Sequence, residues 1–190
     1  MKAATYTILG IFTAVLLTTN MADAQTSYDS VNWPTVKRKT IQSLAKGVMG
    51  RFLTLDENGA LDTTLDSDVE NSGTYWEIDT TYNIRFVRGY MTRVIRNRGN
   101  SVYNGHGLQT DGNLGVSVSG REPLSGNGNR WIVQYTGFYN GYQSFHIQAS
   151  DMSFLTIDPT TGELTLQRKL SPGAHWRVRE SSTLPTDNIR

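Results

Sequence analysis

The residues best suited to binding chemistry lie in one loop-rich segment, Arg96-Asn-Arg-Gly-Asn-Ser-Val-Tyr-Asn-Gly-His106. Tyr103 offers an aromatic face, Asn104 and His106 offer hydrogen-bonding groups, and Arg96 and Arg98 add positive charge. Binding groups often lie on loops that a rigid scaffold carries. These five residues are therefore the candidate ligand-binding site, and a solvated variable loop is the alternative.

Basic residues also gather locally, although the formal net charge is only +1. Lys37, Arg38 and Lys39 form one group, and Arg168 and Lys169 belong to another. Converging cationic groups bind acidic glycans through charge-assisted hydrogen bonds. These five residues are the candidate anionic-glycan patch, with scattered solvated charge as the alternative. The chain has further basic residues at Arg85, Arg88, Arg93, Arg177 and Arg179.

The sequence contains no recognisable catalytic constellation. It has no cysteine, which excludes thiol catalysis and cysteine metal sites. His106, His146 and His175 lack metal-ligand spacing, and His146 is expected to point outward from a strand. We therefore expect no enzyme activity, no metal and no cofactor. The nearly neutral charge argues against nucleic acid as a partner.

An internal period must position all of these groups. In each unit a leucine precedes a tryptophan by 23, 23 and 21 residues, and the pairs are Leu53 and Trp76, Leu108 and Trp131, and Leu155 and Trp176. Since large aromatics dominate core burial, we expect these six residues in the core rather than stacked on a ligand. An aspartate three residues after each leucine is expected to brace a turn through hydrogen bonds to the backbone, and these are Asp56, Asp111 and Asp158.

Strand signals dominate the rest of the chain, with period-two alternation and glycine-containing turns. The segment Ile41–Gly47 is the one place where a short helix is suggested. Gly89-Tyr90 aligns with Gly141-Tyr142 at a spacing of 52 residues. The three units are therefore expected at 36–80, 81–134 and 135–180.

The first 24 residues have the pattern of a cleaved signal peptide, which predicts a secreted, extracellular protein. Lys2 precedes an apolar run of twelve residues, Tyr6–Leu17, and Ala22-Asp-Ala24 supplies the cleavage site. That run is shorter than the roughly 20 residues a membrane span needs, so no transmembrane anchor is expected. Residues 25–35 are expected to be a flexible lead, 36–180 the folded domain and 181–190 a polar tail.

The segment Phe52-Leu-Thr-Leu-Asp-Glu-Asn-Gly-Ala-Leu61, followed by a tryptophan strand, resembles the β-trefoil superfamily. Within it the segment is most similar to the fascin and fibroblast-growth-factor/interleukin-1 type. The resemblance implies an all-β fold of three units with about four strands each. A ricin-type lectin would carry Gln-x-Trp in each unit, whereas this chain has Thr74, Asn129 and Ala174 two residues before the tryptophans. The galactose site of that type is therefore not carried over.

The leading functional hypothesis is lectin-like glycan recognition without catalysis. A growth-factor-like or cytokine-like receptor ligand and a structural component of the extracellular matrix are the alternatives. The partner would be a glycan or an extracellular protein, and the oligomeric state stays open. A fold by itself does not decide among these.

Overall fold

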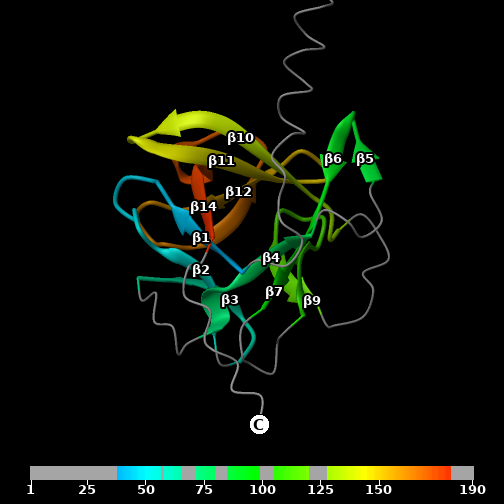
Figure 1. Cartoon of the computed structure of the whole chain (residues 1–190), viewed down its shortest axis with the longest axis horizontal. Helices are drawn as coiled ribbons and strands as arrows, with labels where there is room; N and C mark the ends of the chain where they lie inside the picture. Colours follow the sequence, from blue (N-terminus) through cyan, green and yellow to red (C-terminus); the bar gives the residue numbers. More distant parts are fainter. Residues whose placement is uncertain are drawn as a thin grey trace, which may run out of the picture. The chain divides into compact units, whose positions relative to one another are not determined.

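The computed structural model describes residues 38–56, 58–65, 72–79, 85–98, 105–119 and 128–180 (Figure 1). The predicted signal peptide, the lead and the polar tail lie outside these residues. Within the described part, regular structure consists of strands and two short 3₁₀ turns. No helix in that part is long and apolar enough to cross a membrane.

Three successive units of four strands make up one 12-stranded sheet. The first unit comprises β1 (Lys39–Ser43), β2 (Phe52–Leu55), β3 (Leu61–Thr64) and β4 (Trp76–Asp79). The second comprises β7 (Val94–Asn97), β8 (Gly107–Thr110), β9 (Val116–Ser119) and β10 (Trp131–Tyr139). The third comprises β11 (Tyr142–Ala149), β12 (Phe154–Ile157), β13 (Leu164–Gln167) and β14 (Trp176–Glu180).

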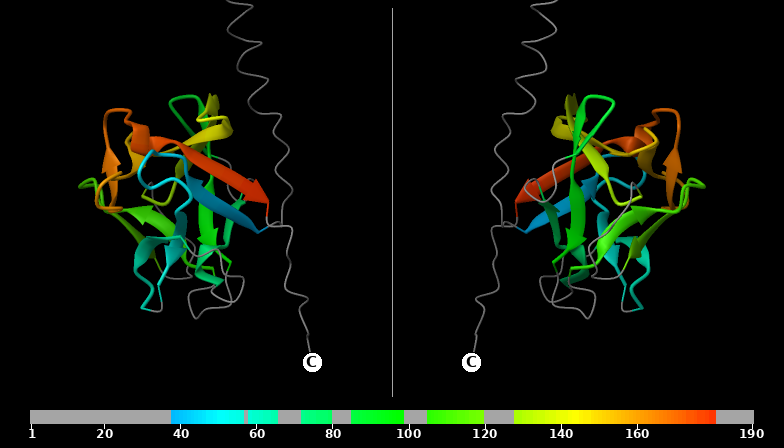
Figure 2. Two further views of the ribbon diagram at one scale, coloured as in Figure 1. Left: turned by 90° about the vertical axis from the view of Figure 1, so that its left-hand side faces the viewer. Right: turned by 90° about the vertical axis from the view of Figure 1, so that its right-hand side faces the viewer.

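Six of these strands form a closed ring. The pairs β1 with β14, β4 with β7 and β10 with β11 are antiparallel. Each of these strand pairs is joined to the next by the pairing of one tryptophan with a residue in or next to a neighbouring pair. The three pairings are Lys39 with Trp76, Arg93 with Trp131 and Phe145 with Trp176. The blue β1 beside the red β14 in Figure 2 shows that the first and last strands of the trefoil close the ring.

The other six strands form three hairpins, β2 with β3, β8 with β9 and β12 with β13. The strands β3, β9 and β13 contact one another, so the hairpins come together over one end of the ring. A six-stranded ring with three such hairpins is a β-trefoil, which confirms the predicted fold of three four-stranded units.

The repeated residues fill the core, as predicted. All six aligned leucines and tryptophans have 0% exposure. Each indole Nε1 donates a hydrogen bond to the carbonyl of the leucine of its own unit, over 2.9 Å to Leu53, 2.8 Å to Leu108 and 2.8 Å to Leu155. A third repeated position, Ile41, Ile95 and Ile147, is also fully buried. The core therefore draws equivalent side chains from all three units.

Each aligned aspartate braces its turn, as the sequence also predicts. Asp56 Oδ1 accepts hydrogen bonds from the backbone of Asn58 and Ala60, at 2.9 and 2.7 Å. Asp111 accepts the equivalent pair of bonds, and Asp158 accepts bonds from the backbone two and three residues further on. Backbone hydrogen bonds from Thr161 and Thr160 lower the pKa of the Asp158 carboxyl below its usual range.

A glycine three residues before each tryptophan is a further repeated feature that the sequence analysis missed. Gly73 lies in η1 (Ser72–Thr74) and Gly173 in η2 (Pro172–Ala174). A Cβ atom at these positions would lie 2.2 Å from the Leu55 carbonyl oxygen and 2.1 Å from that of Ile157. The absence of a side chain lets the 3₁₀ turn approach the neighbouring strand.

The expected short helix and the expected boundary after residue 134 were wrong. The segment Ile41–Gly47 contains the end of β1 and a turn rather than a helix, because the alternation of buried residues in β1 fits a strand. A two-stranded hairpin, β5 (Arg85–Val87) with β6 (Tyr90–Thr92), is added between the first and second units. In addition, β10 runs across the expected boundary at residue 134.

Candidate functional site

Polar and aromatic side chains gather on the outer face of β11. Ile147 and Ala149 point into the core and are fully buried. Because successive side chains of a strand point to opposite faces, Tyr142, Ser144 and His146 point away from the core. Ser144 and His146 are nevertheless only 1% and 9% exposed, so side chains from other elements must cover them.

His175, between η2 and β14, supplies much of this cover. Its ring stacks on Tyr139, with ring centroids 3.8 Å apart and 4° between the planes. Its Nδ1 lies 2.9 Å from Ser144 Oγ, which fits a hydrogen bond in either tautomer. The backbone carbonyl of His175 accepts a hydrogen bond from Leu44 N over 3.0 Å. The imidazole is therefore held in one orientation by β10 and β11, and the loop after β1 holds the backbone that carries it.

His146 lies beneath this layer and makes edge-to-face contacts with two rings. The centroid distances are 4.8 Å to His175 and 5.4 Å to Phe154. Burial, and then the neighbouring His175, lower the pKa of His146 to about 4. Burial also lowers the pKa of His175. His146 points away from the core, as expected, and His175 and Phe154 enclose it there.

One polar atom of His146 is left without a partner. Among the described residues, no group hydrogen-bonds to its buried Nε2. A buried polar group of this kind is uncommon in folded proteins. This leaves an unpaired polar atom beneath the outer layer of side chains on this face of β11.

The exposed end of the same face combines an aromatic ring with a guanidinium. Tyr142 is 40% exposed, and Cζ of Arg177 lies 4.4 Å from its ring centroid. This distance is within the range of a cation–π contact. Burial and the positive charge of Arg179 lower the pKa of Arg177.

We call this set the β11 cluster, and its members are Tyr139, Tyr142, Ser144, His146, His175 and Arg177. It offers an exposed aromatic ring, neutral imidazoles, hydroxyl groups and one guanidinium. Such groups stack on sugar rings and exchange hydrogen bonds with hydroxyls. The cluster contains no carboxylate, so it lacks the paired acids that most glycoside hydrolases use. No group of three or more metal-ligating side chains occurs among the described residues.

The structure describes three of the five predicted loop residues, on β7 and at the ends of β7 and β8. Arg96 lies opposite both Glu77 and Gly107, so it sits between β4 and β8. Arg98 forms an ion pair with Glu77, with Nε and Oε2 2.5 Å apart. His106 accepts a backbone hydrogen bond from Asn97 over 2.8 Å. Tyr103 and Asn104 lie outside the described residues, so the loop site stays a prediction.

The predicted anionic-glycan patch is not supported as one surface. Lys39 is only 2% exposed, and its Nζ lies 3.9 Å from the Glu180 carboxylate. The prediction that Lys39 belongs to a surface patch was therefore wrong, because the inward face of β1 carries it.

Arg38, Arg168 and Lys169 do not complete this patch either. Arg38 is half-buried next to β1, near the end of β14, whereas Arg168 and Lys169 are exposed after β13. Arg168 lies near Asp151, and its charge acts on that carboxyl. Burial alone would raise the pKa of Asp151, but hydrogen bonds from Ser153 and the charge of Arg168 lower it. Because β11 and β14 are antiparallel, Asp151 and the end of β14 lie toward opposite ends of β11. Lys37 lies outside the described residues.

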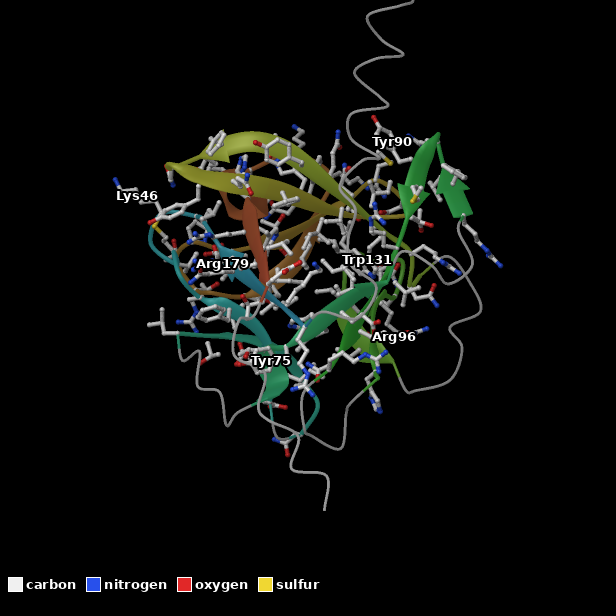
Figure 3. The ribbon with its side chains drawn as sticks, viewed as in Figure 1. Lys46, Tyr75, Tyr90, Arg96, Trp131 and Arg179 are labelled. Carbon is white, nitrogen blue, oxygen red and sulfur yellow. The ribbon has the colours of Figure 1, made fainter. Side chains whose placement is uncertain are left out.

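The β11 cluster itself was missed by sequence reasoning. Its central contact joins Ser144 to His175, which are 31 residues apart. The one available signal was that two of the three histidines fall in the third unit, next to tyrosines and Arg177. Figure 3 shows that Arg179, next to this cluster in sequence, lies well apart from Arg96 of the predicted loop site.

No protein-family model and no curated protein sequence matches the chain. Its structure is similar to that of a Polyporus squamosus lectin bound to the human-type influenza-binding epitope Neu5Acα2-6Galβ1-4GlcNAc. The TM-score is 0.54 and the identity 19%, over 78% of this chain and 50% of that one. It is also similar to SeviL bound to asialo-GM1 saccharide, with a TM-score of 0.55 and 14% identity, over 77% of this chain and 99% of that one.

A third similar structure is a GlcNAcα1-4Gal-releasing endo-β-galactosidase from Clostridium perfringens. The TM-score is 0.54 and the identity 14%, over 77% of this chain but only 33% of the enzyme chain. The present chain thus spans half of the Polyporus lectin chain and a third of the enzyme chain. At these identities the likeness shows the fold alone, and that fold is the β-trefoil.

Proposed function

We propose that this protein is a secreted lectin-like protein that binds glycans without catalysis, through the β11 cluster. Two of the structurally similar proteins are described with a bound saccharide, and both share the trefoil scaffold. The shared fold supports the proposal that the protein binds glycans, and the side chains of the β11 cluster support the proposed place of binding.

The observation that carries the proposal is the arrangement around Tyr142. Its partly exposed ring is flanked by Arg177, and the Tyr139–His175 stack lies on the same outer face of the sheet. A sugar stacked on Tyr142 would come within reach of a guanidinium and of imidazole and hydroxyl groups. These side chains are already oriented by mutual contacts, so binding orders few additional groups.

The test compares two tyrosines in equivalent positions. Tyr142 and Tyr90 both follow a hairpin glycine and are both 40% exposed. Tyr142 belongs to the β10–β11 hairpin, whereas Tyr90 belongs to the β5–β6 hairpin. On a glycan array at low and high salt, we expect the wild type to bind a defined set of glycans. Tyr142→Ala should lose about tenfold or more in affinity, as expected for a central aromatic contact. Tyr90→Ala should bind like the wild type.

Two outcomes would contradict different parts of this proposal. A wild-type protein that binds no glycan at any salt concentration would remove the lectin function and leave a protein partner as the target. Glycan binding that survives Tyr142→Ala would keep the function but move the site, with the segment 96–106 as the next candidate.

Secretion is a separate part of the proposal and rests on the pattern of the first 24 residues. Expression of the full chain in a secreting host should release a protein whose N-terminal residue is Gln25. Retention of the complete chain inside the cell would contradict it.

A further inference from the structure

The trefoil carries two equivalent hairpin tips. Arg88-Gly89 between β5 and β6 and Asn140-Gly141 between β10 and β11 are 52 residues apart. Both turns have two consecutive positive φ angles, 51° and 84° in the first and 50° and 81° in the second. Such two-residue turns suit the twist of a tight hairpin. The two tips are therefore the same structural element in successive units.

Both tips expose the same aromatic side chains. Two residues before each turn stand Phe86 and Phe138, which are 61% and 72% exposed. Directly after each turn stand Tyr90 and Tyr142, which are both 40% exposed. Neither phenylalanine belongs to the hydrophobic core cluster. An isolated exposed apolar residue needs no explanation, but its recurrence at equivalent tips points to a shared role.

The charges around the tips have one sign. Arg85 and Arg88 are exposed on the first hairpin, and Arg177 lies over Tyr142 on the second. Neither the segment 85–92 nor the segment 135–145 contains an aspartate or glutamate. Each tip thus combines phenylalanine, tyrosine and arginine without a carboxylate of its own.

The two hairpins also lie along one side of the trefoil, with their tips toward opposite ends of that side. In Figure 1 the β5–β6 hairpin rises at the upper right, and the β10–β11 hairpin spans the top. Both again reach the top of the trefoil in the two views of Figure 2, and Figure 3 places Tyr90 at that side. A flat surface laid against this side would therefore meet both hairpins.

We infer that the two hairpin tips form a docking surface for an anionic phospholipid bilayer. Phenylalanine enters the boundary between headgroups and acyl chains, tyrosine suits the headgroup level, and arginine binds lipid phosphate. A stable protein interface needs about 800 Å² of closely packed surface on each partner. Two separate aromatic tips suit a soft surface that admits single side chains better than they suit such an interface.

The test measures sedimentation of the full-length protein with vesicles that contain no glycolipid, so the result is independent of the proposed glycan site. Binding is expected to vesicles of phosphatidylcholine with phosphatidylserine, to weaken as salt rises, and to be weaker still on phosphatidylcholine alone. The double variant Phe86→Ser/Phe138→Ser should lose about tenfold or more in partitioning, and each single variant about threefold.

A matched control separates this surface from general exposed hydrophobicity. Leu170, after β13, is 54% exposed, so Leu170→Ser removes a comparable apolar side chain elsewhere. It should partition like the wild type, and circular dichroism should confirm that all variants are folded. Three results would overturn the inference: no binding by the wild type at low salt, equal binding by the double variant, or loss of self-association rather than vesicle binding in that variant.

Discussion

At the scale of single residues, Gly173 and Gly73 leave no room for a side chain. A Cβ would lie only 2.1 and 2.2 Å from a neighbouring carbonyl oxygen, and that oxygen is backbone and cannot rotate away. We expect Gly173→Ala and Gly73→Ala each to lower the free energy of unfolding by about 2 kcal/mol or more, as forced overpacking does. Urea titration followed by circular dichroism measures this change.

The third glycine of the set provides a graded comparison. The distance at Gly128 is 2.8 Å, to the Thr110 carbonyl oxygen, so Gly128→Ala should destabilise less than the other two. Pro172→Ala, at an exposed position of the same 3₁₀ turn as Gly173, should change stability little. Equal effects of all four substitutions would show that the close approach to the carbonyl is not the cause.

His146 makes stability depend on pH in a defined direction. Its pKa is about 4 in the folded protein and 6.5 in the unfolded chain, so between these values the unfolded state binds more protons. The stability that comes from the neutral His146 is therefore fully present above pH 6.5 and is lost as the pH falls toward 4. We expect thermal unfolding to show a loss of about 2–3 kcal/mol over this interval.

Replacement of the ring identifies its share of this pH dependence. His146→Phe keeps an aromatic ring against Phe154 and His175 but cannot take up a proton. The variant should lose most of the decrease in stability between pH 7 and pH 4.5, even if it is less stable at neutral pH. An unchanged pH dependence would assign the effect to His175 or to the carboxylates instead.

The residues that the sequence predicts well are those that recur. Leu53, Trp76 and Asp56 each have two counterparts at fixed spacing, so packing and turn geometry constrain all three copies in the same way. Lys39 was misplaced because it lies on the inward face of β1, and the enclosure of His146 was not predicted because distant elements supply its cover. Glu180 and His175 lie far along the chain from them, and no local pattern reveals those contacts.

At the scale of elements, the two hairpin tips have equivalent turns but differ in how the rest of the fold stabilises them. The β10–β11 hairpin belongs to the main sheet, and its tip is tied to the loop after β1 by a 2.9 Å hydrogen bond from Asn140 Nδ2 to Leu44 O. The strands β5 and β6 form a separate two-stranded sheet. Such a hairpin alone is only marginally stable in water.

This difference predicts unequal effects of the same substitution. Gly89 and Gly141 both have positive φ, and a Cβ on either would contact nothing within 4 Å, so alanine introduces only backbone strain. Gly141→Ala should lower global stability by about 1 kcal/mol. Gly89→Ala should change it by less than about 0.5 kcal/mol and should instead speed amide hydrogen exchange at Val87 and Tyr90. Equal shifts of the urea midpoint would contradict this assignment.

The 52-residue spacing predicts that these two tips correspond, but it does not predict that one hairpin is detached from the main sheet. The same holds for the predicted loop site. Its sequence places Arg96, Arg98 and His106 near one another, and the structure places them on the paired strands β7 and β8 or at their ends. That Glu77 engages Arg98 depends on strand register, which the local sequence does not specify.

At the scale of the whole molecule, the core is shared by three units that cannot be separated. Ring closure pairs β1 with β14, so the first and third units complete each other. Each tryptophan also contributes to one continuous cluster of buried side chains. A trefoil built in this way should unfold in one cooperative transition, whichever unit is weakened.

Substitution of the three tryptophans tests this expectation. Trp76→Phe, Trp131→Phe and Trp176→Phe each remove a buried indole donor and leave the leucine carbonyl of that unit without its hydrogen bond. Combined with the lost volume, each should lower the free energy of unfolding by about 2–4 kcal/mol. Urea transitions monitored by far-ultraviolet circular dichroism and by amide exchange should coincide in all three variants. A variant in which one unit loses protection while the other two keep it would show that the units fold independently, and that ring closure does not couple them.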